Sequence, residues 1–160
     1  MTLTEATELV KRKISEIFLT RGRAFVAIDG PCASGKSTLG AHLASKLGAP
    51  LIAADDFFLR PEQRTPDRLA EIGGNLDRER LADEVLLPLS EHRTANLRTY
   101  DCKTQKISEP KVISPTEILI VEGSYSHHPD LKKFYDLTVF LDTPPALQWE
   151  RISGQMENAG

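Results

Sequence analysis

Residues 24–37 read AFVAIDGPCASGKS, and this stretch decides the fold. Its first five residues form an apolar run with β-branched and aromatic members, which predicts a buried parallel strand. Residues 30–37 match the pattern G-x-x-x-x-G-K-[ST]. Residues 37–47 then read as a helix that Gly48 closes. A strand, a glycine-containing loop and a helix in this order predict a phosphate-binding loop.

The loop offers the groups that hold nucleotide phosphates. Its glycines let backbone N–H groups turn inward, and the following helix adds the positive end of its dipole. Lys36 can reach the β- and γ-phosphates, and the Ser37 hydroxyl can ligate Mg²⁺. We therefore predict ATP and Mg²⁺ as cofactors; the alternative is a glycine turn with a solvated lysine. The predicted nucleotide-binding residues are Gly30, Pro31, Cys32, Ala33, Ser34, Gly35, Lys36, Ser37 and Thr38.

The rest of the chain alternates between helical and strand patterns. Apolar spacing predicts helices over 4–20 and 76–89, with Asp77 as a cap, and a last short helix from Pro144. Further strands are predicted over 50–54, 118–121 and 137–141, a loop or broken helix over 60–75, and a β-hairpin over 97–113. This order predicts an α/β fold: a P-loop NTPase-type three-layer sandwich with a mainly parallel sheet and a small β-hairpin insertion.

Length and composition fit one globular domain. The chain has 160 residues, 40% hydrophobic and 27% charged, with a formal net charge of -3. We expect residues 1–160 to form a single domain, with an N-terminal helix over 1–20, a core over 21–152 and a disordered tail over 153–160. The mild acidity gives no reason to expect nucleic acid as a partner. No run approaches the roughly 18 apolar residues of a membrane span, and two distant cysteines match no zinc or redox spacing, so we expect a cytoplasmic protein without a membrane partner.

Carboxylates follow the predicted strands. Asp55 is our candidate for the base that accepts a proton from a hydroxyl, with Asp56 and Phe57 shaping an acceptor pocket; the alternative for either aspartate is the cap of a turn. Glu122 suits a place in the Mg²⁺ site, the alternative being a plain surface carboxylate. Asp142 precedes two prolines and is predicted to cap a helix.

Several motifs in order resemble the uridine kinase-like branch of P-loop kinases, which includes pantothenate kinase and phosphoribulokinase. The resemblance covers about residues 20–152. The matching stretches are DGPCASGKS (29–37), DDFF (55–58), NLDRERL (75–81), YD (100–101) and VEG (121–123). The resemblance implies that Asp55 is the catalytic base, Glu122 the magnesium-associated carboxylate and Tyr100 an acceptor-pocket aromatic. Gln105 stands where nucleoside kinases of this branch often have histidine.

These expectations combine into a function. We expect an ATP-dependent phosphotransferase that moves the γ-phosphate to a hydroxyl of a small molecule, such as a nucleoside. The resemblance also implies an arginine-bearing lid after the fourth strand, of which this sequence shows little, so the alternatives are a weakly active or inactive ATP-binding homologue and another small-molecule kinase of sugars or the coenzyme A pathway. Arg151 is either the first lid arginine or a solvated residue.

Three further expectations concern residues outside these motifs. An open sheet edge could pair with a second copy in a homo-oligomer. His127 and His128 are expected to be solvated loop residues, and Trp149 a packing residue rather than an adenine platform.

Overall fold

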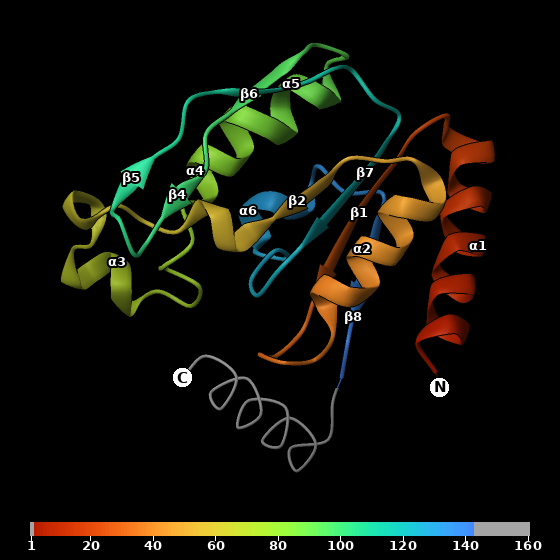
Figure 1. The fold of residues 1–160 in the computed structure, drawn as a ribbon, viewed down its shortest axis with the longest axis horizontal. Helices are drawn as coiled ribbons and strands as arrows, with labels where there is room; N and C mark the ends of the chain where they lie inside the picture. Colours follow the sequence, from red (N-terminus) through yellow and green to blue (C-terminus); the bar gives the residue numbers. More distant parts are fainter. Residues whose placement is uncertain (1, 143–160) are drawn as a thin grey trace.

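The computed structural model describes residues 2–142, and Figure 1 shows their arrangement. At the centre is a four-stranded sheet with the order β2-β7-β1-β8. The strands are β2 (Leu51–Ala53), β7 (Ile118–Glu122), β1 (Ala24–Asp29) and β8 (Leu137–Phe140). All neighbouring strands are parallel. Their carboxyl ends therefore lie along one edge, where open α/β sheets bind ligands.

Alternation along the central strands divides the core into two layers. Val26 and Ile28 of β1 pack on one face together with Ile120 of β7. Phe25 and Leu119 pack on the other face, because successive side chains of a strand point in opposite directions. All five side chains are fully buried. Burial on both faces explains why β1 reads as a continuous apolar run.

Helices α1 (Leu3–Arg21) and α2 (Lys36–Leu47) cover the first of these faces. Their buried contacts with the sheet are made by Val10, Ile14, Leu39 and Leu43. A capping box starts α1: the Thr2 hydroxyl accepts the N–H of Glu5, and the Glu5 carboxylate accepts the N–H of Thr2. This reciprocal pair satisfies two N–H groups that have no partner inside the helix.

A helix from Arg78 to Ser90 covers the second face in three continuous segments. These are α4 (Arg78–Leu81), the π-helical turn η3 (Ala82–Leu86) and α5 (Leu87–Ser90). Asp77 caps its start by accepting the N–H of Arg80 at 3.2 Å, as the sequence predicts. The short helix α6 (Pro129–Lys132) joins the same layer through Leu131.

Short elements connect these layers. Two antiparallel pairs form the hairpin: β3 (Ala95–Leu97) with β6 (Lys111–Ile113), and β4 (Tyr100–Asp101) with β5 (Lys106–Ile107). After β2 come the 3₁₀ turns η1 (Ala54–Phe57) and η2 (Pro61–Gln63) and the helix α3 (Pro66–Ala70). The loop or broken helix predicted over 60–75 and the predicted hairpin are both confirmed.

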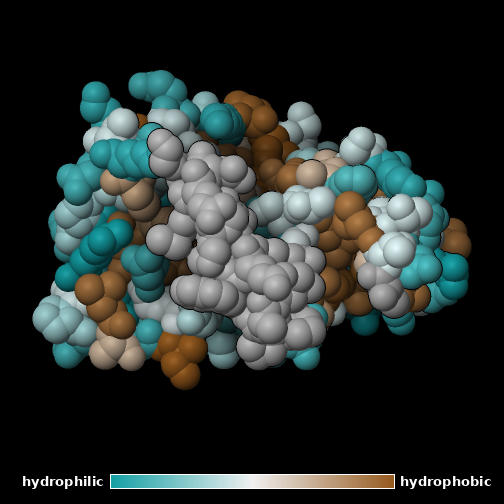
Figure 2. Space-filling view, turned by 60° about the horizontal axis from the view of Figure 1, so that its bottom comes forward, coloured by the Kyte–Doolittle hydropathy of each residue, from teal (hydrophilic) through white to brown (hydrophobic). Residues whose placement is uncertain are grey.

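The structure confirms the predicted three-layer α/β sandwich and its parallel sheet. Two strands are shorter than predicted: β2 ends at Ala53, because Ala54 already begins the turn η1, and β8 ends at Phe140. The helix predicted from Pro144 lies outside the described residues. On the face seen in Figure 2, small hydrophobic areas interrupt a largely hydrophilic surface. Within residues 2–142, no helix combines the length and hydrophobicity needed to cross a membrane.

Candidate active site

The loop between β1 and α2 has the form of a phosphate cradle. Gly35 precedes α2 with φ +98, and α2 starts at Lys36, so the helix N-terminus faces the loop. The side chain of Lys36 is buried and its Nζ donates to the carbonyl of Pro31 at 2.8 Å. Ser34 Oγ is buried and has no hydrogen-bond partner among the described residues. Backbone N–H groups, a lysine and an unsatisfied hydroxyl suit a bound phosphate.

Ser37 and Glu122 meet across the first turn of α2 and the end of β7. The Ser37 hydroxyl donates to Oε1 of Glu122 at 3.2 Å. Ser37 is exposed, whereas Glu122 is only 6% exposed. The pairing of β7 with β1 puts Glu122 beside Ile28, directly before the loop. The structure therefore brings together the two residues that the sequence assigns to Mg²⁺.

Burial is the main cause that raises the pKa of Glu122 above its ordinary value of 4.5. The negative charges of Asp55 and Asp56 raise this pKa further, while the hydrogen bond from Ser37 and the charge of Lys36 lower it. A carboxylate that responds to all these groups lies close to them. The site is electrostatically prepared for a cation, which would relieve the repulsion between its carboxylates.

Asp55 reaches this edge because the loops after β2 and β7 touch. Gly123 has φ +145, and a Cβ on it would lie only 2.5 Å from the Cβ of Ala54. Only glycine permits this approach. Asp55 and Asp56 follow Ala54 on the turn η1, and both are exposed at the sheet edge. The proposed base therefore stands next to the carboxylate of the proposed metal site.

Charged groups from the hairpin and from α4 act on Asp56. Its pKa is raised, first by burial and further by the charge of Asp55, whereas Lys111 of the hairpin and Arg80 of α4 lower it. Arg80 also contacts the Asp56 carbonyl through Nη2 at 3.5 Å. The hairpin and the helix from Arg78 thus both help to fix the turn η1, a role that local sequence patterns do not reveal.

The predicted acceptor-pocket residues divide into different environments. Tyr100 is 5% exposed and pairs with Ile107, and its strand β4 lies against the turn η1. Gln105 is exposed at the tip of the hairpin with φ +54. Phe57 is fully buried in the core, with the Arg80 guanidinium 4.6 Å from its ring centroid. Its ring has no exposed surface to offer an acceptor, so the prediction for Phe57 is corrected; its neighbour Phe58 is half-buried.

Asp29 is a site residue to which our sequence reasoning assigned no role. Its Oδ1 accepts the N–H of Gly30 at 2.6 Å and of Tyr125 at 3.1 Å, and its Oδ2 accepts the N–H of His127 at 3.0 Å. The carboxylate thereby ties the start of the phosphate loop to the loop after β7. An acidic residue at the end of a central strand is the signal that could have identified it.

The two adjacent histidines are less exposed than expected for solvated loop residues. Both are half-buried. His127 Nε2 lies 2.9 Å from the carbonyl of Ala27, and His128 Nδ1 accepts the N–H of Asp130 at 3.1 Å as the cap of α6. They are structural parts of the loop after β7.

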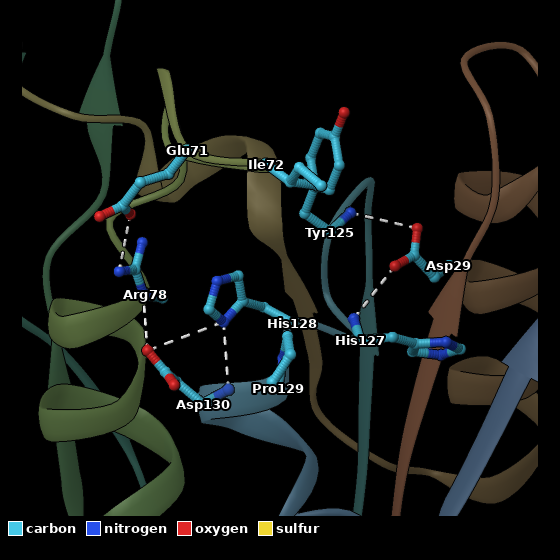
Figure 3. Close-up of a pocket in the computed structure, with 9 residues that line it drawn as sticks. All are labelled: Asp29, Glu71, Ile72, Arg78, Tyr125, His127, His128, Pro129 and Asp130. Carbon is cyan, nitrogen blue, oxygen red and sulfur yellow. Dashed lines mark hydrogen bonds and ion pairs between the residues drawn. The ribbon is translucent and has the colours of Figure 1, made fainter. Parts of the chain in front are cut away.

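An open pocket of about 680 Å³ lies beside Asp29 (Figure 3). Its walls come from the end of β1, from the segment 71–78 that leads into α4, and from residues 125–130. The residues that line it are Asp29, Glu71, Ile72, Arg78, Tyr125, His127, His128, Pro129 and Asp130. The pocket therefore shares Asp29 with the entrance of the phosphate loop.

The donor set fits Mg²⁺ bound together with a nucleotide. Mg²⁺ usually takes one or two protein oxygens and completes its shell with phosphate oxygens and water. Ser37 and Glu122 supply such oxygens, and residues 2–142 contain no cluster of three or more His, Cys, Asp or Glu side chains that could hold a metal by themselves. A nucleotide would have to share in holding the ion. Arg151 lies outside the described residues.

Known proteins with the same fold include several small-molecule kinases. The "Possible Uridine Kinase" from Bacillus stearothermophilus shares 24% identity and a TM-score of 0.73, over 98% of this chain and 93% of that chain. The "putative fructose transport system kinase" from Silicibacter sp. TM1040 has 23% identity and a TM-score of 0.76, and the match covers 100% of this chain and 84% of that chain. A D-glycerate 3-kinase from Cryptococcus neoformans var. grubii has 17% identity and a TM-score of 0.52, and the match covers 76% of this chain and 53% of that chain.

A sequence model of the Phosphoribulokinase / Uridine kinase family matches residues 72–158, more than half of the chain. The match begins in the segment that leads into α4 and includes Tyr100 and Glu122. It agrees with the P-loop, the parallel sheet and the hairpin described above. The chain belongs to the Phosphoribulokinase / Uridine kinase family of P-loop small-molecule kinases.

Proposed function

We propose that the protein transfers the γ-phosphate of ATP to a hydroxyl of a small molecule. The observation that carries this proposal is the convergence of Asp55, Glu122 and Ser37 at one sheet edge, where the charge of Asp55 acts on the pKa of Glu122. A phosphate cradle, two metal-type oxygens and a separate exposed carboxylate are what phosphoryl transfer to a hydroxyl requires.

Each residue has a defined part in the reaction. The backbone of the loop and Lys36 bind the β- and γ-phosphates. Asp55 accepts the proton of the acceptor hydroxyl while the acceptor oxygen bonds to the γ-phosphorus and the bond to the β,γ-bridging oxygen breaks, which releases ADP. Ser37 and Glu122 would hold Mg²⁺, which neutralises phosphate charge when bound. Tyr100 would border the acceptor through its strand beside η1.

A mixed pool of nucleosides, sugars and other small alcohols, incubated with labelled ATP, tests this function. We expect label in one acceptor, and a decrease of about 10²–10⁴-fold in kcat for Asp55→Asn with ATP binding retained. Asp56→Asn is the matched control, because it removes the adjacent carboxylate on the same turn; we expect a smaller decrease. Near-normal turnover by Asp55→Asn would show that another group is the base. Binding of ATP without transfer to any acceptor would show that the protein is a nucleotide-binding homologue.

A further inference from the structure

The pocket beside Asp29 lies within reach of the reacting groups. Tyr125 follows Glu122 by three positions, so their Cα atoms are at most about 11 Å apart. Asp29 lines the pocket and also accepts the N–H of Gly30, the first residue of the phosphate loop. The loop that carries Tyr125 leaves β7 at Gly123, which touches the turn that carries Asp55. A molecule the size of a monosaccharide or nucleoside could therefore extend from Asp55 into this pocket.

The ionisable side chains of the pocket carry an excess of negative charge. Its described lining contains three carboxylates, Asp29, Glu71 and Asp130, and one guanidinium, Arg78. The next charged pair outward, Arg68 and Glu79, is ion-paired at 2.5 Å and adds no net charge. With both histidines neutral, as in the formal net charge of the chain, this balance stays negative. Two negative charges are left uncompensated around the cavity.

The only cation in this lining is already committed to its neighbours. Arg78 Nε donates to Asp130 at 2.9 Å and its Nη2 donates to Glu71 at 2.9 Å. The side chain is only 12% exposed, and its Nη1 is buried and has no hydrogen-bond partner among the described residues. Figure 3 shows the guanidinium held between these two carboxylates. A phosphate or carboxylate entering the pocket would meet fixed negative charge with no accessible positive charge to balance it.

Part of the pocket wall is apolar. Tyr125 is 49% exposed and Ile72 is 83% exposed, and both line the cavity. Gly73 lies against the Tyr125 ring, since a Cβ on Gly73 would be 2.8 Å from its Cγ. Exposed apolar side chains at the rim of a pocket are typical of a ligand-binding surface. They can cover an apolar face of a ligand that carries no negative charge.

We propose that this pocket holds the part of the acceptor remote from the reacting hydroxyl, and that it selects acceptors that are uncharged or cationic there over acceptors that carry a phosphate or carboxylate. The inference rests on the proposed kinase function. Such a pocket discriminates acceptors by their charge. Free sugars, polyols, nucleosides and amino alcohols fit, whereas sugar phosphates and hydroxy acids do not. Repulsion of the wrong partner is a common basis of specificity.

Matched acceptor pairs that differ mainly in one acidic group test the inference. Suitable pairs are ribose and ribose 5-phosphate, glycerol and glycerate, pantothenol and pantothenate, and uridine and uridine 5′-monophosphate. We expect the neutral member of the pair that is used best to have a kcat/KM at least about tenfold higher than its acidic partner. Binding of the same compounds without ATP is measured by calorimetry.

Three variants connect that preference with the pocket. Glu71→Gln and Asp130→Asn each remove one negative charge of the pocket at an exposed position, while the amide oxygen can still accept the hydrogen bond from Arg78. We expect both to reduce the neutral-to-acidic ratio by about threefold or more, mainly by lowering KM for the acidic member. Glu91→Gln is the control: Glu91 is also exposed and ion-paired, to Arg93 at 3.2 Å, but it follows α5, at the end of the Arg78–Ser90 helix opposite to Arg78. In this variant, the ratio of kcat/KM for the neutral acceptor to kcat/KM for the acidic one should equal that of the parent protein.

The outcomes separate this inference from the function on which it rests. Phosphate transfer with an acidic acceptor preferred, or a ratio that Glu71→Gln and Asp130→Asn leave unchanged, overturns the pocket inference while the kinase function stands. Binding of a neutral acceptor that Tyr125→Ala abolishes, without transfer to any acceptor, refutes the kinase function while the pocket assignment stands. If no compound of either kind, neutral or acidic, is bound or phosphorylated, both are refuted.

Discussion

The Ser37 hydroxyl donates a hydrogen bond to Glu122 Oε1 at 3.2 Å, which links the first turn of α2 to the last residue of β7. These two residues are 85 positions apart in the sequence. The bond holds an exposed hydroxyl and a buried carboxylate on one side of the phosphate loop. In the proposed reaction, it would give the nucleotide-bound metal a site that exists before the ligand arrives.

Glu122→Gln should weaken the use of Mg²⁺ much more than it changes the fold. Glutamine keeps an oxygen that can accept the Ser37 hydrogen bond, but it lacks the negative charge that attracts the ion. We expect the Mg²⁺ concentration for half-maximal activity to rise by about 10- to 100-fold. A Mg²⁺ titration at saturating ATP measures this effect, and circular dichroism checks the fold. An unchanged Mg²⁺ dependence would exclude Glu122 from the metal site.

The same variant should be more stable than the parent protein at neutral pH. Because burial raises the pKa of Glu122 in the folded state, ionised Glu122 destabilises the fold, and Glu122→Gln removes that effect. We expect an increase of about 2–5 °C in Tm at pH 7. The difference should shrink as the pH falls through the raised folded-state pKa, and it should vanish below the ordinary value of 4.5. Thermal melts of both proteins between pH 4 and 8 measure it; a difference that grows toward low pH would contradict the argument.

Asp29→Asn should loosen both the phosphate loop and the loop after β7. The Asp29 carboxylate accepts three backbone N–H groups, and an asparagine amide has only one oxygen with which to accept them. We expect a loss of about 1–3 kcal/mol in the free energy of unfolding and a higher KM for ATP. Urea unfolding and initial rates measure the two effects. Asp142→Asn, at an exposed position just after β8, serves as the control and should change neither quantity.

Gly123→Ala should displace the proposed catalytic turn. Its new Cβ would lie 2.5 Å from the Cβ of Ala54, so the turn that carries Asp55 must move. We expect a loss of about 2–4 kcal/mol in stability and at least about tenfold in kcat, since small displacements of a reacting group are costly. Gly48→Ala is the control, with φ +60 but nothing within 4 Å of its Cβ. It should lose only about 1–2 kcal/mol and keep its kcat; equal kcat values for the two variants would contradict the proposed position of Asp55.

The sequence predicts the sheet and much of the site because these depend on local patterns. The apolar run before the phosphate loop predicts β1. Asp55 and Glu122 each follow an apolar run, which predicts that they lie at the carboxyl ends of strands. Topology then brings them together, since parallel strands end at one edge. These predictions do not require knowledge of which distant segments are in contact.

The predictions that fail depend on contacts between distant segments. Phe57 is buried in the core cluster by apolar side chains from distant segments and is also covered by Arg80; the sequence of the turn itself gives no sign of these contacts. The role of Asp29 depends on N–H groups of Tyr125 and His127, 96 and 98 positions away. The same bonds order the loop that holds the histidines. A pattern within ten or twenty residues cannot contain this information.

The central position of β1 has a consequence for synthesis of the chain on the ribosome. Residues 24–29 are made well before their partners in the sheet, β7 and β8, which begin at Ile118 and Leu137. At roughly 5–20 residues per second, β1 waits several seconds or longer before either partner exists. During that time its apolar side chains and backbone N–H groups are unpaired, and it resembles an aggregation-prone segment. The strand that carries the phosphate loop is therefore a segment that a ribosome-associated chaperone would protect during synthesis.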